Sequence, residues 1–289
     1  MLSTYHPVTV FLYFVVSISA TVLFTHPACI MLSLAAAIGY AVWQKGAEAV
    51  RFGLTAALPV IVVFTIVNPL VNHKGSTILF YIKYSAITLE AVLYGLFSGI
   101  MFAAVMFWFV SFNENLTSDK LLYLFAKVSP SAALIITMSL RLIPRMKRRV
   151  IAIASAQKTI GNDVFAGGLK VRLKNGIKIL SALTTWSLEN SIETADSMNA
   201  RGYGRRGRSF YSPYTYEKRD KIAIIFLIAI AALIFWSGIK GNIAFKYYPA
   251  IQGSLMPQDI APELLINALL FLMPVIFNTM ELIYWKFSR

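Results

Sequence analysis

Four arginines and three glycines stand within residues 201–208, in a chain that is otherwise rich in apolar residues. A guanidinium group forms planar, multidentate hydrogen bonds with phosphates, carboxylates and carbonyls. Glycines among the arginines let a partner approach the backbone closely. Tyr203, Phe210 and Tyr211 add aromatic rings that suit stacking on nucleic-acid bases. This cluster is therefore a candidate binding site for nucleic acid, lipid phosphate or a protein.

The same glycines, at positions 202, 204 and 207, match the spacing of a dinucleotide-binding loop. That loop needs a strand before it and a helix after it, so that the phosphates meet a helix N-terminus. Here the glycines follow an expected helix and lead into "SFYSPYTY", which is typical of a loop. They therefore fit the end of a helix better than a nucleotide site.

Catalytic and metal-binding patterns are missing from the sequence. The chain contains no GxxxxGK[ST] phosphate loop, so any ATP hydrolysis belongs to another subunit. His6, His26 and His73 lack metal-ligand spacing, and the single Cys29 builds neither a soft metal site nor an internal disulfide. We therefore expect no enzyme active site, no metal and no cofactor.

The composition is that of an integral membrane protein. Hydrophobic residues make up 57% of the chain and charged residues only 14%, against about 25% in an average soluble domain. The mean hydropathy is +0.65. So few charges cannot cover the surface of a soluble fold, whereas lipid solvates the outer face of a membrane protein.

Apolar runs define the expected spans. A helix needs about 20 apolar residues to cross the hydrocarbon core, where its backbone groups must be satisfied internally. Runs with few or no charges lie at about 8–24, 28–43, 52–71, 86–112, 222–239 and 264–284. We predict an all-α integral membrane protein with about six transmembrane helices, four N-terminal and two C-terminal.

Basic residues predict the orientation and the domains. Lys45 and Arg51 favour a cytoplasmic loop between the second and third spans, and therefore a cytoplasmic N-terminus and C-terminus. Residues 1–112 then form an N-terminal membrane domain, 113–220 a cytoplasmic domain, and 221–289 the C-terminal spans. Most of the basic residues fall in the cytoplasmic domain, as the orientation requires.

The cytoplasmic domain is unusually apolar in places. Residues 121–143 would make a seventh span, but Lys127, Pro130 and Arg141 interrupt them. Amphipathic helices that lie along the membrane surface, with their basic residues toward anionic lipid, fit this pattern better.

A helix is expected over residues 177–200. Glu189, Glu193 and Asp196 follow at i, i+4 and i+7 and form one acidic stripe. Most of the remaining circumference is apolar, from Leu180, Leu183, Trp186, Leu188, Ile192 and Met198. Such a helix must pack against other helices or lipid.

Gly95 and Gly99 form a G-x-x-x-G pattern inside the fourth span. Small residues at this spacing let two membrane helices approach closely. The partner is either another helix of this chain or a membrane helix of a second protein.

Four short segments together resemble one family. They are "HP" at 6–7, "NPLVNHKG" at 68–75, "SLRLIP" at 139–144 and "ADSMNARGYG" at 195–204. In this order and spacing they resemble the transmembrane T component of energy-coupling factor (ECF) transporters, which import vitamins and metals. The cobalt and biotin T subunits belong to the same family.

The resemblance implies a cytoplasmic coupling domain of long amphipathic helices, two of which end in Ala-Arg-Gly tips. These tips dock into grooves on two ATP-binding-cassette ATPase subunits. Ala200, Arg201 and Gly202 would form one tip. The other tip departs from the pattern, because the arginine position of Thr159-Ile160-Gly161 holds an isoleucine. Arg141 and Pro144 of "SLRLIP" and the acidic stripe would support the coupling helices.

The function implied by the resemblance is energy coupling in the plasma membrane of a prokaryote. Motion of two ATPase subunits, identical or not, would pass through this chain to a substrate-binding S component, which takes up a vitamin, metal ion or other micronutrient. Two other classes remain open from the residues alone. One is a secondary transporter or channel that carries its own substrate, and the other is a membrane-anchored nucleic-acid-binding protein.

Overall fold

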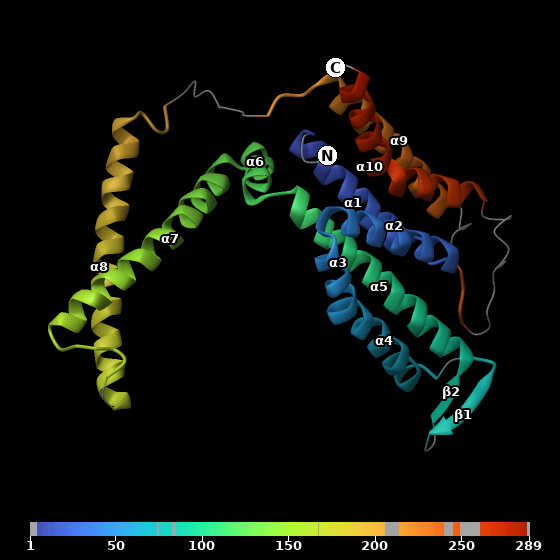
Figure 1. The fold of residues 1–289 in the computed structure, drawn as a ribbon, viewed down its shortest axis with the longest axis horizontal. Coiled ribbons are helices and arrows are strands. Elements are labelled where there is room, and N and C mark those ends of the chain that lie inside the picture. Colours follow the sequence, from blue (N-terminus) through green and yellow to red (C-terminus); the bar gives the residue numbers. More distant parts are fainter. Residues whose placement is uncertain are drawn as a thin grey trace. The chain divides into compact units, whose positions relative to one another are not determined.

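The structure is a computed structural model that describes residues 5–73, 75–82, 85–166, 168–205, 214–239, 245–248 and 261–287. It divides into two compact units (Figure 1). Residues 1–121 and 214–289 form the first unit, and residues 122–213 form the second. Assignment of the segments 1–112, 113–220 and 221–289 to membrane and cytoplasm stays a prediction.

The first unit is built of apolar helices, in agreement with the predicted all-α membrane fold. They are α1 (Pro7–Leu23), α2 (Pro27–Lys45), α3 (Ala47–Phe52), a π-helical turn (Gly53–Ala57), α4 (Leu58–Val71), α5 (Leu89–Asn115), α9 (Lys218–Ile239) and α10 (Ala261–Phe287). Every predicted apolar run coincides with helix over most of its length. Four stretches, Pro27–Lys45, Ala47–Val71, Leu89–Asn115 and Lys218–Ser237, are long and apolar enough to cross a membrane, while Pro7–Leu23 and Ala261–Val275 are shorter.

The first two helices begin in the same way. His6 and His26 stand at the N-caps of α1 and α2, and the Nδ1 atom of each accepts the backbone N–H two residues on, at 3.2 Å. A proline follows at the first helical position, where its missing N–H has no helical partner to lose. The two His-Pro pairs are therefore helix starts.

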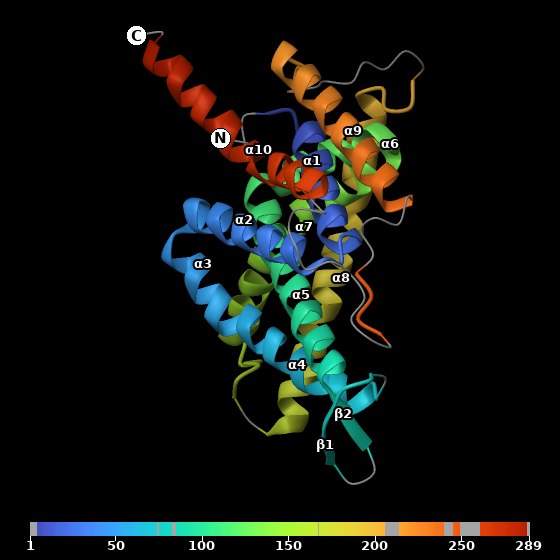
Figure 2. The same ribbon diagram turned by 90° about the vertical axis from the view of Figure 1, so that its right-hand side faces the viewer.

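The α5 helix lies at the centre of the first unit, against α4, α2 and α1. Its fully buried Trp108 donates an Nε1–H hydrogen bond to the Ser33 hydroxyl of α2 at 3.1 Å. The Ser33 hydroxyl also lies 2.6 Å from the Thr21 hydroxyl of α1. Figure 2 shows α10 beside α2 and α9 beside α1. Such polar contacts hold helices together where lipid offers no competing hydrogen bonds.

A buried carboxylate joins the starts of α1 and α9. Asp220, on α9, accepts the backbone N–H of His6 at 2.9 Å and the backbone N–H of Glu217 at 3.1 Å. The His6 ring stacks on Tyr216 with the ring centres 3.7 Å apart. Since both helix N-termini carry partial positive charge, one carboxylate satisfies the two together.

A β-hairpin between α4 and α5 departs from the predicted helix-only chain. Strands β1 (Ile78–Ile82) and β2 (Ser85–Thr88) pair antiparallel, so the start of the fourth apolar run is strand rather than helix. The segment "ILFYI" is β-branched and aromatic, which favours strand. Glu90, in the first turn of α5, anchors the hairpin because its carboxylate accepts the backbone N–H groups of Ser76 and Thr77.

The second unit consists mainly of two long helices, α7 (Pro130–Thr159) and α8 (Leu169–Ala200), which follow α6 (Ser118–Val128). Pro130 is at the first helical position of α7, so it ends the apolar run of α6 and starts a new helix. Among the described helices, α7 does not qualify as a membrane span. The run 121–143 is therefore divided between α6 and α7 rather than formed by one continuous helix.

Candidate docking tips on the α7–α8 pair

The α8 helix ends in a defined turn at the predicted Ala-Arg-Gly tip. Ala200 is the last helical residue, and Gly202 has a φ of +78°. The backbone N–H of Gly202 donates to the carbonyl of Asn199, and that of Tyr203 to the carbonyl of Met198, both at 3.0 Å. This pair of bonds is a Schellman motif, in which the residue with positive φ is best a glycine.

The α7 helix ends in the same motif. Gly161 has a φ of +84°, and its N–H donates to the carbonyl of Lys158 at 3.1 Å. The N–H of Asn162 donates to the carbonyl of Gln157 at 2.9 Å. Thr159-Ile160-Gly161 therefore occupies the same three backbone positions as Ala200-Arg201-Gly202.

The middle residue of each tip is presented to the outside. Ile160 is 72% exposed, and Arg201 is exposed as well. Their backbone angles nearly coincide, with φ −92° and ψ 7° at Ile160 and φ −81° and ψ 5° at Arg201. The Arg201 side chain forms no ion pair with any residue that the structure describes. The two tips thus share one backbone shape but differ in chemistry, one apolar and one cationic.

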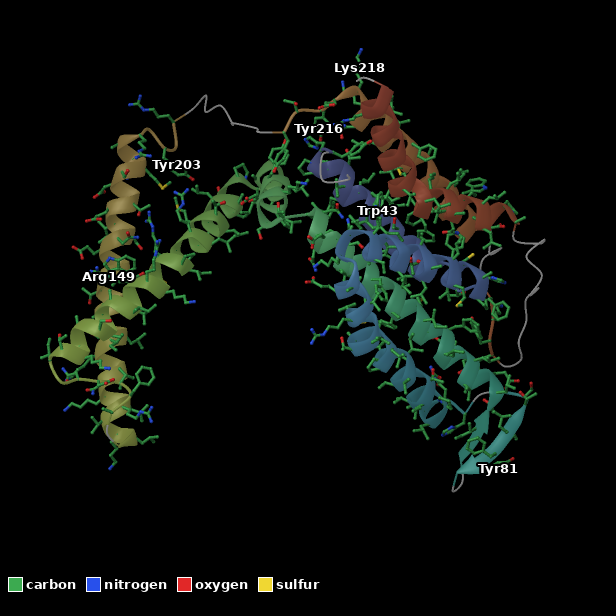
Figure 3. All side chains as sticks on the ribbon, viewed as in Figure 1. Trp43, Tyr81, Arg149, Tyr203, Tyr216 and Lys218 are labelled. Carbon is green, nitrogen blue, oxygen red and sulfur yellow. The ribbon has the colours of Figure 1, made fainter. Side chains whose placement is uncertain are left out.

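The two tips lie at opposite ends of the α7–α8 pair (Figure 1). The helices cross where Arg149 of α7 lies over the ring of Trp186 of α8, 5.5 Å from the ring centre (Figure 3). Ile179 and Leu183 of α8 are buried. A cation over an indole face is attracted by the negative charge of the π system, which stabilises the crossing.

Side chains of α8 hold the segment that follows the Thr159-Ile160-Gly161 tip. The Asn162 amide donates to the Gln157 side chain at 3.0 Å and accepts from Lys178 at 2.9 Å. Asn175 donates to the carbonyl of Asp163 at 3.1 Å. The tip at Ile160 is therefore fixed to the start of α8 rather than mobile on a free loop.

Asp163 adds a charged contact to the same segment. The pKa of its carboxyl is held below the usual range, first by the backbone N–H of Phe165, which donates at 2.9 Å, and also by Lys158 at 3.5 Å. Each contact favours the charged form of the carboxyl. The segment is thus ordered by hydrogen bonds and one partly exposed ion pair.

The Ala200-Arg201-Gly202 tip lies beside the first turns of α7. Arg201, Gly202 and Tyr203 line a depression of about 300 Å³ together with Leu134, Met138 and Met198. The exposed face of this tip therefore has an apolar neighbour within the same unit.

The residues expected to support the coupling helices are not gathered in one place. Arg141 lines a groove between α7 and α8, whereas Glu189, Glu193 and Asp196 are exposed and form no ion pair with any described residue. Pro144 is exposed inside α7.

Sequence reasoning missed Arg145, which lines the groove beside Arg141. Residues at i and i+4 share one helix face, so the spacing of these two arginines was the available signal.

Gly95 and Gly99 pack α5 against α4 within this chain. A Cβ atom at Gly95 would lie 2.6 Å from the carbonyl oxygen of Phe64, and one at Gly99 would lie 2.9 Å from the Cα of Ile61. Both positions are buried. The glycines therefore allow the two helix backbones to touch.

Comparison with known proteins places the chain in a family. The family model for the cobalt transport protein CbiQ matches residues 3–211. The energy-coupling factor transporter transmembrane protein EcfT of Lactococcus lactis is 27% identical over 194 residues, which cover 62% of this chain and 72% of that protein. EcfT of Staphylococcus aureus is 27% identical over 193 residues, covering 61% and 71%. EcfT of Bacillus subtilis is 35% identical over 105 residues, covering 36% and 40%. The chain therefore belongs to the cobalt transport protein family, CbiQ, as an EcfT-like transmembrane component of an energy-coupling factor transporter.

Proposed function

We propose that this chain couples two ATP-binding-cassette ATPase subunits to a substrate-binding S component, with the ends of α7 and α8 as the docking tips. The observation that carries the proposal is the pair of matching Schellman motifs at Gly161 and Gly202, at opposite ends of the pair. Two tips with the same backbone shape suit two similar partner subunits. Membership of the transporter family supports the same conclusion.

The two tips would bind by different chemistry. Arg201 offers planar donors to carboxylate or carbonyl groups in a groove on one ATPase subunit. Ile160 offers only an apolar side chain to the other. We therefore infer two non-equivalent docking sites, with ATPase subunits that differ or that tolerate both tips.

The mechanism follows from the lever that the two helices form. When ATP binding closes the ATPase pair, the tips move with their subunits, and the α7–α8 crossing near Arg149 and Trp186 changes angle. That movement would pass to the S component, which reorients in the membrane and releases a vitamin, metal ion or other micronutrient inside the cell. This chain would supply contact surface and leverage, with both termini in the cytoplasm and hydrolysis left to its partners.

Mild detergent extraction of the tagged chain from its own cells, followed by mass spectrometry, tests this function. The expected co-eluting proteins are one or two ATPases with phosphate loops and a small membrane protein that binds the cargo. The purified chain alone should hydrolyse no ATP. Substrate uptake by vesicles that contain only this chain would contradict the proposal and favour a secondary transporter.

A further inference from the structure

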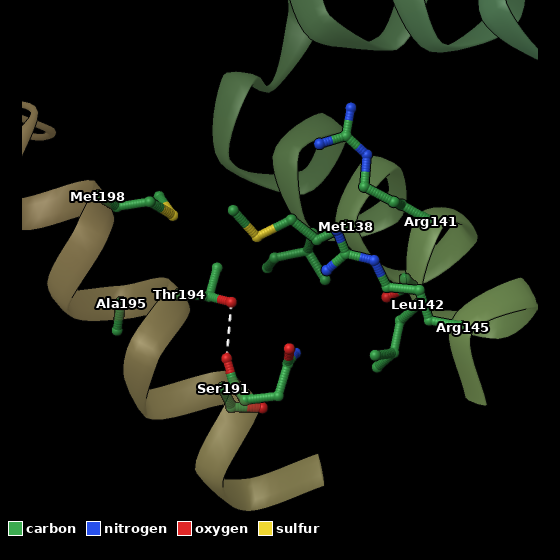
Figure 4. Close-up of a pocket in the computed structure, with 11 residues that line it drawn as sticks. Met138, Arg141, Leu142, Arg145, Ser191, Thr194, Ala195 and Met198 are labelled. Carbon is green, nitrogen blue, oxygen red and sulfur yellow. Dashed lines mark hydrogen bonds between the residues drawn. The ribbon is translucent and has the colours of Figure 1, made fainter. Parts of the chain in front are cut away.

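A groove of about 360 Å³ runs between α7 and α8, within the second unit. Figure 4 shows Met138, Arg141, Leu142 and Arg145 on the α7 side, and Ser191 and Thr194 on the α8 side. Its lining thus combines apolar, cationic and hydroxyl groups.

The charge in the groove is uncompensated. Arg141 and Arg145 are one helical turn apart, and neither forms an ion pair with a described residue. None of the described side chains that line the groove is acidic. The groove therefore suits an anion.

The acids of α8 are turned away from these arginines. At 100° per residue, the stripe of Glu189, Glu193 and Asp196 lies on nearly the opposite side of α8 from the groove residues Ser191 and Thr194. The acids and the arginines of the pair therefore do not neutralise one another.

The α7 helix changes from apolar to basic at the groove. Its first half exposes Ile135, Ile136 and Leu140, by 64%, 42% and 45%, and the basic segment "RLIPRMKRR" begins at Arg141. Exposed apolar residues next to arginines are typical of a helix that passes from the acyl layer of a membrane to its headgroups. An amphipathic anion thus fits this place better than a free ion.

The hydroxyl groups of Ser191 and Thr194 further restrict which anionic headgroup fits the groove. Ser191 and Thr194 donate to the backbone carbonyls of Ser187 and Asn190, at 2.7 and 2.6 Å. A hydroxyl has one proton to donate and two lone pairs that accept, so each remains an acceptor. They therefore favour a headgroup that carries its own hydroxyl donors.

We propose that this groove binds an anionic phospholipid with a hydroxyl-bearing headgroup, of which phosphatidylglycerol is the example to test. The phosphodiester is held by Arg141 and Arg145, the headgroup hydroxyls donate to Ser191 and Thr194, and an acyl chain lies along Met138. The lipid anchors the α7–α8 pair at the membrane surface. This role goes beyond ATPase docking and does not depend on it.

The test is native mass spectrometry of the delipidated full chain, titrated with dioleoylphosphatidylglycerol or dioleoylphosphatidylcholine. The phosphatidylglycerol should bind at least about tenfold more tightly, and inorganic phosphate should not displace it. Arg141→Gln with Arg145→Gln should raise the apparent Kd about tenfold or more, because charged hydrogen bonds are lost. Lys147→Gln with Arg148→Gln removes the same charge from the same helix outside the groove, and should change the Kd less than about twofold.

Ala195→Trp tests whether binding needs the open groove, independently of the charge of the arginines. Ala195 lines the groove, so a tryptophan there fills it without changing the net charge, and should also weaken binding of phosphatidylglycerol. Thermal unfolding of every variant should match the unaltered chain. Recovery of ATPase subunits with Ala195→Trp should match it as well, which separates this proposal from the docking function. Equal losses in both double variants with none in Ala195→Trp would show a diffuse basic surface and overturn the proposal. Unchanged lipid binding with loss of a co-purifying membrane protein would overturn it in favour of a protein-docking groove.

Discussion

Gly202 and Gly161 give the two tips their shape, because each ends its helix at a φ that L-residues rarely adopt. At Gly202 an added Cβ would have no neighbour closer than Arg205 Cδ at 3.5 Å, and at Gly161 none within 4 Å. Substitution there would strain the backbone without a steric clash. A docking role at these positions would therefore depend on backbone conformation, which can be separated experimentally from side-chain contact.

Gly202→Ala should lower the free energy of unfolding by about 1 kcal/mol, because alanine is strained at positive φ. It should also lower ATPase recovery. Gly176→Ala, inside α8 with no neighbour within 4 Å, should instead raise the free energy of unfolding by about 0.5–1 kcal/mol. Thermal unfolding in detergent measures both. A stabilised Gly202→Ala variant would show that the tip does not need this turn.

Among the helices, the close approach of α4 and α5 depends on two glycines. A Cβ at Gly95 or Gly99 would lie within 3 Å of α4 backbone atoms, and backbone cannot yield as a flexible side chain does. The two helices would have to move apart along their length. This contact therefore positions the hairpin that follows α4.

Gly95→Ala with Gly99→Ala should destabilise the chain by about 1–3 kcal/mol, the usual cost of overpacking. Gly39→Ala on α2 is the matched control, because an added Cβ there meets nothing within 4 Å. Thermal unfolding of the detergent-solubilised chain measures the difference. An equal change in stability for the double variant and for Gly39→Ala would show that helix propensity, rather than contact between α4 and α5, determines the result.

Sequence alone predicted most of the helices, because hydropathy and proline placement are local signals. The correspondence of Thr159-Ile160-Gly161 and Ala200-Arg201-Gly202 came from the family resemblance rather than from a local signal, and the two segments end their helices in the same turn. It did not predict the β-hairpin, because β2 runs directly into α5 and its apolar residues were assigned to that helix. Nor did it predict the groove, because which faces of α7 and α8 meet depends on how the two long helices cross.

Across the whole chain, the predicted topology places the hairpin outside the cell and the α7–α8 pair inside. Cys29, the single native cysteine, is buried, so it gives little background labelling. A cysteine at Tyr81, which is 66% exposed, should react with an impermeant thiol reagent in intact cells. A cysteine at the exposed Ala166 should react only after permeabilisation. Labelling of position 166 from outside would reverse the orientation and exclude cytoplasmic docking.

Recovery of ATPase subunits with the tagged chain tests most directly whether the α8 tip is a docking site. Arg201→Ala should weaken association about ten- to a hundredfold, because each charged hydrogen bond contributes about 1.5–3 kcal/mol. Ile160→Ala removes apolar contact only and should weaken it less. Arg148→Ala removes an exposed charge from α7 away from both tips, and should have the smallest effect, through salt-screened attraction. The account predicts this order at both low and high ionic strength; equal losses for Arg201→Ala and Arg148→Ala, both rescued at low salt, would contradict it.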